Sequence, residues 1–292
     1  MNVATSVMTT ATLSVADREM AEVVRANATD RQPVIFIHGL WLLSSSWNRW
    51  LEVFEKAGYI GLTPGWPDDP ETVAEANANP GPMAGKTIRQ VADHFAKIAG
   101  SLNRRPAIIG HSFGGLLAQI LAGRGLSIAT AAIDPAGFRG VLPLPFSALK
   151  SAFPVLGNPA NRGRAVSLTY EQFRYAFANA VDEVEAKSLY DTYAVPAPGA
   201  PLFQAAMANF NPWTEATVDT KNPRRGPLLI VSGERDHTVP PAVAGAALKK
   251  QKFNPGHTEF LEMKDRGHAL TIDHGWHEVA DATLSFLQRF TA

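Results

Sequence analysis

The chain has 292 residues, of which 46% are apolar, and it carries 27 Lys and Arg against 27 Asp and Glu. This length and apolar content allow a full hydrophobic core, whereas the balanced charge provides no long-range field to gather nucleic acid or an anionic membrane. Because there is no cysteine, disulfides, thiolate zinc sites and cysteine nucleophiles are excluded. We therefore expect one domain with an insertion that acts on a small neutral molecule.

Residues 1–30 are interpreted as an N-terminal extension. They hold no basic segment followed by an apolar stretch, as a signal peptide requires, and the chain has no run of about 18 apolar residues. The expected location is cytoplasmic, as a monomer or homodimer without a membrane partner.

Short apolar runs with β-branched residues alternate with longer amphipathic segments, which is typical of a parallel sheet flanked by helices. The expected strands are 33–37, 59–63, 107–110, 129–133, 228–232 and 259–263. The spacing of apolar residues predicts helices over 46–57, 87–99, 113–122, 241–251 and 274–290. Residues that follow the strands should meet at the carboxyl edge of the sheet, where such folds build their sites.

Two stretches interrupt this alternation. Residues 137–225 are rich in Phe, Tyr, Pro and Ala, include helical pieces such as 170–193, and are interpreted as a cap over the active edge. The core domain then comprises 31–136 and 226–292. Residues 66–85, rich in Pro, Gly and Asn, are predicted to be a loop without a regular element that borders the pocket.

The third expected strand leads into Gly110-His111-Ser112-Phe113-Gly114, which matches the G-x-S-x-G pattern. A sharp strand-to-helix turn would hold Ser112 in a strained conformation, with glycines where a Cβ would clash. A chance match is the alternative, and the strand before the pattern and the helix after it argue against one. Ser112 is the predicted nucleophile.

A serine hydroxyl needs a base to remove its proton. His268 follows the last expected strand in Asp265-Arg266-Gly267-His268, so a loop would bring it to the sheet edge. His274 and His277 share one helix face, but no third ligand converges with them in the sequence. The sequence therefore predicts His268 as the base and no metal site.

Two carboxylates could orient this base and stabilise its charged form. Asp236 follows the strand 228–232 after a short turn, and Asp134 follows the strand 129–133 directly. We favour Asp236 as the acid and keep Asp134 as the alternative, since an aspartate before Pro135 is also a common turn former.

The tetrahedral intermediate of acyl transfer needs two backbone donors. The N–H of Phe113 at the start of a helix would supply one, and the N–H of Leu40 in the His38-Gly39-Leu40-Trp41 turn the other. A buried turn with a core tryptophan is the alternative for the second. The expected substrate pocket is lined by Trp41, His111, Phe138, Phe146 and Trp213. Other cap residues could line it or form the cap core: Leu142, Phe153, Phe173, Tyr175, Phe177, Phe203 and Phe210.

Taken together, His38-Gly39, the Gly110–Gly115 turn, Gly233-Glu234-Arg235-Asp236 and Gly267-His268 resemble the α/β-hydrolase superfamily, in particular its capped, cofactor-free serine esterase and non-haem haloperoxidase-like branch. The resemblance runs from Pro33 to Phe290. It implies an α/β-hydrolase fold, with a mostly parallel sheet, flanking helices and a mainly helical cap inserted between strands 6 and 7. Residues 1–32 depart from it, being weakly β for the customary first hairpin.

The order Ser112, Asp236, His268 is that of the α/β-hydrolases. The resemblance implies hydrolysis of a carboxylic ester or lactone of a small to medium apolar molecule through an acyl-enzyme, without metal or organic cofactor. Serine at the nucleophile position argues against dehalogenase and epoxide hydrolase activities, which use aspartate there. A lyase or perhydrolase with the same triad, or a ligand receptor that hydrolyses slowly, remains an alternative.

Overall fold

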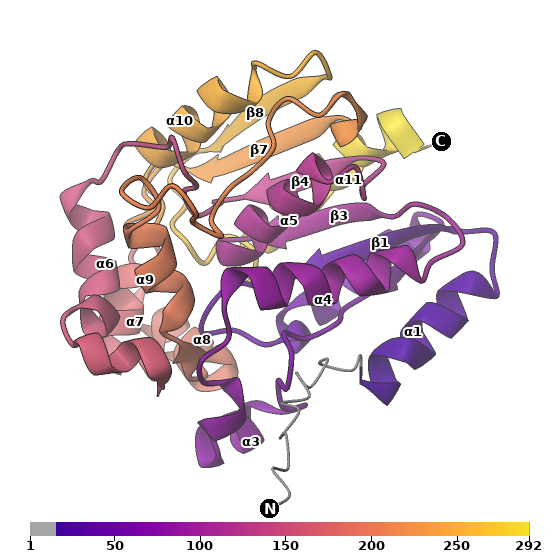
Figure 1. Ribbon diagram of the computed structural model, residues 1–292. Helices are drawn as coiled ribbons and strands as arrows, with labels where there is room; N and C mark the ends of the chain where they lie inside the picture. Colours follow the sequence, from indigo (N-terminus) through magenta and orange to yellow (C-terminus); the bar gives the residue numbers. More distant parts are fainter. Residues whose placement is uncertain (1–15, 292) are drawn as a thin grey trace, which may run out of the picture.

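A six-stranded parallel sheet forms the centre of the computed structural model, which describes residues 16–291 (Figure 1). The strands run in the order β2-β1-β3-β4-β7-β8. They are β1 (Gln32–Ile37), β2 (Tyr59–Leu62), β3 (Ala107–His111), β4 (Thr130–Ile133), β7 (Leu228–Gly233) and β8 (Thr258–Met263). Each agrees with an expected strand to within one residue at either end. β1, β2, β3, β4 and β7 are buried along their whole length because helices cover both faces of the sheet, whereas the edge strand β8 is partly exposed.

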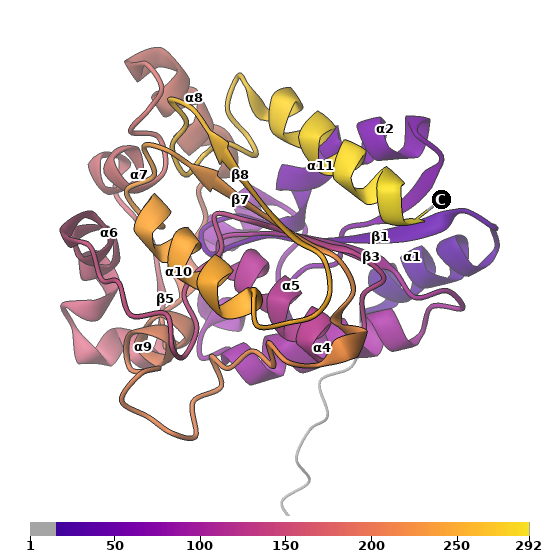
Figure 2. The ribbon, with the colours of Figure 1, turned by 90° about the horizontal axis from the view of Figure 1, so that it is seen from above.

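Helices lie on both sides of this sheet (Figure 2). One face carries α4 (Ile88–Gly100), α5 (Phe113–Gly123) and α10 (Pro241–Gln251), and the other carries α2 (Asn48–Lys56) and α11 (Trp276–Thr291). Successive residues of β1 serve the two layers in turn, as the pleat of a strand requires. Ile35 packs into the first layer, and Phe36 packs edge-on against Trp50 of α2 in the second.

Before β1 the described chain forms a helix, α1 (Asp17–Asn27), and no strand pair. Val23 and Ala26 of α1 are buried in the same core as α4 and α5. The cap is therefore inserted between the fourth and fifth strands of the central sheet, β4 and β7. This is the position expected from the sequence, because these two strands are numbered 6 and 7 in α/β-hydrolases that begin with a two-stranded hairpin.

The cap lies over the carboxyl ends of the strands (Figure 1). It contains α6 (Phe146–Leu156), α7 (Tyr170–Ala176), α8 (Glu183–Tyr193) and α9 (Ala200–Ala206), with an antiparallel pair, β5 (Ala165–Val166) and β6 (Ala197–Pro198). The helical piece expected over 170–193 is divided in two, because Asp182 caps the start of α8 by accepting a hydrogen bond from the Glu185 N–H. None of the helices in residues 16–291 has the length and apolarity needed to cross a membrane.

The prediction that 66–85 lacks regular structure is wrong. This segment contains α3 (Val73–Ala78), whose first turn is closed by a capping box: the Thr72 side chain accepts from the Glu75 N–H, and Glu75 accepts from the Thr72 N–H. The T-x-x-E signal was present in the sequence, but the surrounding Pro and Gly residues obscured it. Four short 3₁₀ turns complete the described structure, at Ser44–Trp47, Gly81–Met83, Pro159–Gly163 and Pro223–Arg225.

Candidate active site

Ser112 lies at a strained turn between β3 and α5, with φ 57° and ψ −120°. Non-glycine residues rarely adopt positive φ, and a strained backbone of this kind is common at functional sites. The turn is possible because Gly114 has no side chain: a Cβ there would lie 2.0 Å from the Ile37 carbonyl oxygen. The start of α5 is thus packed directly against the end of β1, and Ser112 is held at the carboxyl edge of the sheet.

The structure brings Ser112, His268 and Asp236 into one hydrogen-bonded chain. His268 Nε2 lies 2.9 Å from Ser112 Oγ, and His268 Nδ1 lies 2.6 Å from Asp236 Oδ2. Only 4% of Ser112 and none of His268 is exposed to solvent. In this geometry the carboxylate fixes the imidazole tautomer with the proton on Nδ1, so that Nε2 can accept the hydroxyl proton of the serine.

The Asp236 carboxylate is itself held in place by its own loop. Its Oδ1 accepts hydrogen bonds from the N–H groups of Thr238 and Val239, at 2.6 and 2.9 Å. These two donors use one oxygen and leave Oδ2 directed at His268. Short hydrogen bonds from backbone donors to an ionised carboxylate are among the stronger ones in proteins.

Asp134, the alternative acid, lies close to the same histidine without bonding to it. Its Oδ2 is 3.9 Å from His268 Nδ1 and has no hydrogen-bond partner in residues 16–291, whereas its Oδ1 accepts from the Gly233 N–H at 2.7 Å. Burial, together with the negative charge of Asp236, raises the pKa of Asp134 well above its usual range. Both effects disfavour the ionised form of Asp134 beside His268.

Contacts from the core and from the cap hold His268 in place. The Nε2–H of His111 donates to the His268 carbonyl at 2.9 Å, and burial lowers the pKa of His111 well below its usual range, so its ring stays neutral. From the cap, the Phe177 carbonyl accepts from the Ala269 N–H at 3.0 Å, and the Phe177 ring lies edge-on to His268 with centroids 4.8 Å apart. His111 therefore fixes the loop that carries His268 and, contrary to the expectation from the sequence, it does not lie in a substrate pocket.

Leu40 lies in the turn after β1, and Phe113, the residue after the nucleophile, begins α5. Phe113 precedes the intrahelical hydrogen-bond ladder, so its N–H has no helical acceptor. Gly39 brings the Leu40 turn close to Ser112, because a Cβ on Gly39 would lie 2.7 Å from Ser112 Cβ and 3.3 Å from Ser112 Oγ. The turn that carries Leu40 is thus packed closely against the nucleophile.

His38, which adjoins the glycine turn and was interpreted as its support, holds the Gly39 turn together with two partners that the sequence did not predict. His38 Nδ1 donates to the Gly39 carbonyl at 2.9 Å, and His38 Nε2 lies 3.0 Å from Asp69 Oδ2. Trp66 stacks on the His38 ring and donates its indole N–H to the His38 carbonyl at 3.2 Å. Asp69 and Trp66 belong to the segment 66–85 and match no motif, so the sequence gives no signal for this contact.

The predicted pocket residues are divided between the site and the surface. Trp41 and Phe138 are buried in the core with Leu40 and Phe113, and Trp41 meets the Phe177 ring edge-on. Phe146 and Trp213, by contrast, are 79% and 84% exposed. The structure therefore places both outside any pocket at Ser112. Phe146 lies outward because α6 turns its other side inward, and Trp213 lies in the exposed segment that follows α9.

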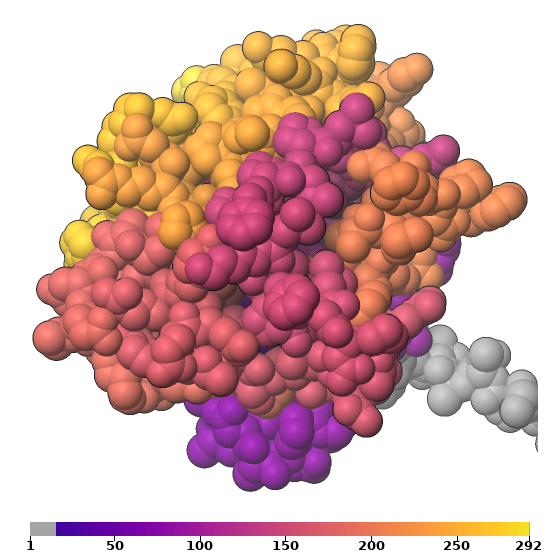
Figure 3. Space-filling view, turned by 90° about the vertical axis from the view of Figure 1, so that its left-hand side faces the viewer, coloured from indigo at the N-terminus to yellow at the C-terminus, as the bar shows by residue number. Residues whose placement is uncertain are grey.

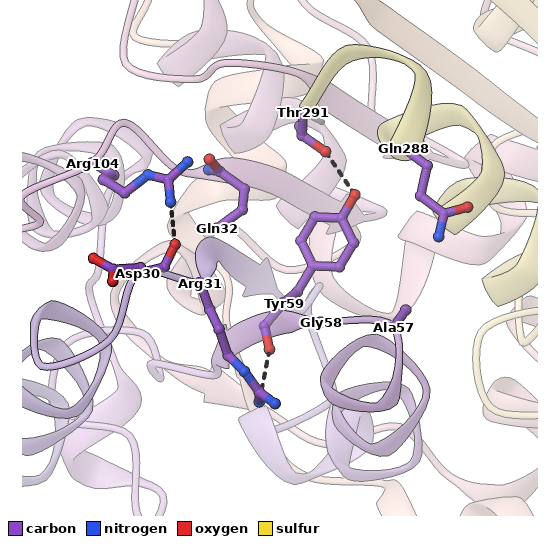
Figure 4. Close-up of a pocket in the computed structure, with 9 residues that line it drawn as sticks. All are labelled: Asp30, Arg31, Gln32, Ala57, Gly58, Tyr59, Arg104, Gln288 and Thr291. Carbon is purple, nitrogen blue, oxygen red and sulfur yellow. Dashed lines mark hydrogen bonds between the residues drawn. The ribbon is translucent and has the colours of Figure 1, made fainter.

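Hollows lie at both edges of the sheet. The one bordered by Gly39 and Trp41 measures about 10 Å³, which is too small to hold an ester substrate. A larger hollow of about 680 Å³ lies at the opposite edge, where Gln32 and Tyr59 begin β1 and β2 (Figure 4). Its arginines point to separate backbone carbonyls and do not converge on a ligand position.

One set of possible metal ligands overlaps the hydrogen-bonded chain. His111, Asp134 and His268 each offer a ligand atom, and these atoms lie within 4.8 Å of one another. Both ring nitrogens of His268 already face Ser112 and Asp236. A cation there would have to break that chain, and we assign no metal to it.

Replacing Gly39 by alanine is expected to lower kcat for an aryl ester by about 10²–10³-fold, since the added Cβ must displace the Leu40 donor from the nucleophile. Steady-state kinetics and thermal unfolding would be measured together. Gly245→Ala is the matched control: it lies in α10 with nothing within 4 Å of the added Cβ, so turnover should stay unchanged. Turnover of Gly39→Ala at the wild-type rate would show that the turn does not supply the donor.

Comparison with known families identifies the chain over most of its length. A profile of the alpha/beta hydrolase family matches residues 34–282, which includes Ser112, Asp236 and His268. No curated protein matches in a sequence search.

Solved structures resemble this fold at low sequence identity. A monoacylglycerol lipase from Paleococcus ferrophilus is 20% identical, with a TM-score of 0.63 over 89% of this chain and 95% of that one. An extracellular alpha/beta-hydrolase from a Paenibacillus species is 19% identical, with a TM-score of 0.62 over 87% and 98%. A Mycobacterium tuberculosis protein described as a non-heme bromoperoxidase is 18% identical, with a TM-score of 0.59 over 89% and 91%. At such identities the likeness establishes the fold.

Proposed function

The chain belongs to the alpha/beta hydrolase family, and from this premise we propose that it is a serine hydrolase that cleaves a carboxylic ester or lactone through an acyl-enzyme. The observation that carries the proposal is the continuous chain from Ser112 Oγ through His268 to Asp236. Each of the three is nearly or fully buried, so the proton transfers are shielded from bulk water.

In the first half of the proposed reaction, Ser112 Oγ attacks the substrate carbonyl while His268 Nε2 takes the hydroxyl proton. Asp236 stabilises the imidazolium that forms, and the Leu40 and Phe113 N–H groups bind the oxyanion. His268 then gives its proton to the leaving oxygen, which departs as an alcohol. In the second half, water loses a proton to His268, attacks the acyl carbon and releases the acid, and the proton returns to Ser112.

The walls around the serine favour an uncharged, apolar acyl group. The Phe177 ring lies edge-on to His268 and to Trp41, and both aromatic side chains are buried. Burial of an unpaired charge among such side chains is costly. Lipases and ester hydrolases occur among the structural neighbours, which is consistent with ester cleavage in general. A small to medium apolar ester or lactone is therefore the proposed substrate class.

A matched pair of esters tests this proposal. We expect wild-type protein to release p-nitrophenol continuously from the butyrate ester, and to hydrolyse the monosuccinate ester, similar in length but ending in a carboxylate, at least about 100-fold less efficiently. Aliphatic lactones of similar size, and the p-nitroanilide of butyrate as the amide control, complete the panel. Stoichiometric labelling of Ser112 without continuous release would favour a slowly hydrolysing receptor, and no turnover of any ester or lactone by folded protein would refute the proposal.

A further inference from the structure

Large apolar side chains are exposed mainly on the cap, in two separate segments. One runs from 142 to 153 and the other from 207 to 213. Their exposed members, here called the cap patch, are Leu142, Leu144, Phe146, Leu149, Phe153, Met207, Phe210 and Trp213. Contiguous apolar surface of this kind marks interaction sites in soluble proteins.

Helix α6 is turned so that its apolar face points outward. Phe146, Leu149 and Phe153 follow one another at spacings of three and four residues, which places them on one side of the helix. Phe146 and Phe153 are 79% and 70% exposed, whereas Ser151 and Val155 on the other side are buried. A helix packed for a globular core would show the reverse pattern.

The two segments of the cap patch lie side by side. The Arg139 N–H donates to the Ala216 carbonyl at 2.8 Å, and the Asn209 side chain bridges them by accepting from the Gly140 N–H and donating to the Val141 carbonyl. Figure 3 faces this surface, where the magenta chain leading into α6 adjoins the orange segment that follows α9. The apolar side chains therefore belong to one surface of the cap.

The two stretches of chain that carry the cap patch contain cations and no acidic residue. Between Asp134 and Glu171 the chain has no acidic residue, and residues 192–214 carry no charge at all. The cations of the first stretch are Arg139, Lys150, Arg162 and Arg164, and in residues 16–291 none of them forms a salt bridge. Lys150 lies within α6 four residues after Phe146, and its ammonium group lies over the Tyr175 ring, 4.0 Å from the ring centroid.

We propose that the cap patch docks on an anionic lipid–water interface, with its apolar side chains among the lipids and its cations against the headgroups. Exposed aromatic and aliphatic side chains combined with Lys and Arg are the features that bind proteins to such surfaces. A second copy of the chain fits less well, because a two-fold contact would place the same unpaired cations opposite each other. The balanced charge of the whole sequence, from which no membrane partner was expected, conceals this local excess.

The patch lies on the cap that covers Ser112, and apolar esters partition into lipid. Docking would therefore bring the covered edge of the sheet to a phase in which such substrates are concentrated. Binding itself needs no acyl transfer, so Ser112→Ala should bind as well as the wild type. Loss of docking and loss of hydrolysis can thus be distinguished.

Co-sedimentation with phosphatidylcholine vesicles, with and without phosphatidylglycerol, tests the docking. Wild type and Ser112→Ala should bind the mixed vesicles more tightly than pure phosphatidylcholine, and less tightly at high salt. The triple variant Phe146→Ser, Phe153→Ser, Trp213→Ser should lower the partition coefficient at least about 100-fold, and Lys150→Gln alone about 5-fold. Val24→Ser with Val184→Ser, which removes exposed apolar side chains from α1 and α8, is the control and should bind like the wild type.

Three results would overturn the proposal. If the wild-type protein binds neither kind of vesicle, the cap patch is not a lipid-binding surface. If the triple variant binds vesicles as well as the wild type, the contact lies elsewhere on the protein. A dimer in light scattering that the triple variant dissociates, without vesicle binding by the wild type, assigns the patch to a second copy of this chain.

Discussion

Alanine at position 112 is expected to reduce kcat by about 10⁶-fold and to abolish labelling by a fluorophosphonate, while the protein stays folded. The serine hydroxyl has one side-chain partner, His268. The backbone contacts that shape the turn remain in the variant: the Ser112 N–H donates to the Ile133 carbonyl, and the Ser112 carbonyl accepts from Leu116 and Ala136. The free energy of unfolding should change by no more than about 1 kcal/mol.

Ser127→Ala is the matched control for this measurement. Ser127 is also fully buried, but it precedes β4 at the amino edge of the sheet, and its hydroxyl donates to the Ala129 carbonyl. Its loss should cost about 1 kcal/mol of stability and leave labelling and kcat unchanged. Labelling that persists in folded Ser112→Ala would assign the nucleophile to another residue.

The sheet and its strand ends could be predicted because β1, β2, β3, β4 and β7 are fully buried apolar runs, each with a clear stop. The edge strand β8 is partly exposed, and its place was indicated by the loop with His268 that follows it. The positions of Ser112, Asp236 and His268 followed from where those strands end. Gly114 shows why the motif is informative, since any side chain there would collide with the end of β1.

Contacts between segments that match no motif could not be predicted. Asp69 reaches His38 across the chain from a Pro- and Gly-rich stretch, and nothing in its neighbouring residues indicates that role. The cap is similar: helical spacing locates α6 but does not say which face is turned inward, so Phe146 was expected in a pocket and lies at the surface. Which face is buried depends on what the rest of the cap leaves uncovered.

The sequence favoured Asp236 over Asp134, but both follow strands that adjoin each other in the sheet, so their distances from the base needed coordinates. Asp236 lies 2.6 Å from the base nitrogen and Asp134 lies 3.9 Å from it. Asp236→Asn is accordingly expected to lower kcat by about 10⁴-fold, since an amide no longer fixes the tautomer or stabilises the imidazolium. Asp134→Asn keeps an acceptor for the Gly233 N–H and should change kcat by less than about 10-fold.

The stability of Asp134→Asn gives a second, independent readout. The raised pKa of Asp134 means that the fold favours its protonated form, so its contribution to stability is present below the unfolded pKa of about 3.9 and is lost as the pH rises through the folded pKa. Asparagine is neutral throughout and carries no such loss. The variant should therefore unfold at an equal or higher temperature than the wild type at pH 8, with the difference shrinking toward pH 4.

Together, the Asp236→Asn and Asp134→Asn variants show which of the two carboxylates is ionised and orients His268. If Asp134 were the orienting acid, Asp134→Asn would show the large loss in kcat, Asp236→Asn the small one, and the stability of Asp134→Asn would fall at pH 8. The opposite pattern is expected because the donors from Thr238 and Val239 stabilise charge on Asp236, whereas Asp134 has one backbone donor and an unpaired buried oxygen. Ionising both carboxyl groups this close to one histidine costs electrostatic free energy, because the two negative charges repel each other. The backbone hydrogen-bond donors determine which carboxyl group is ionised.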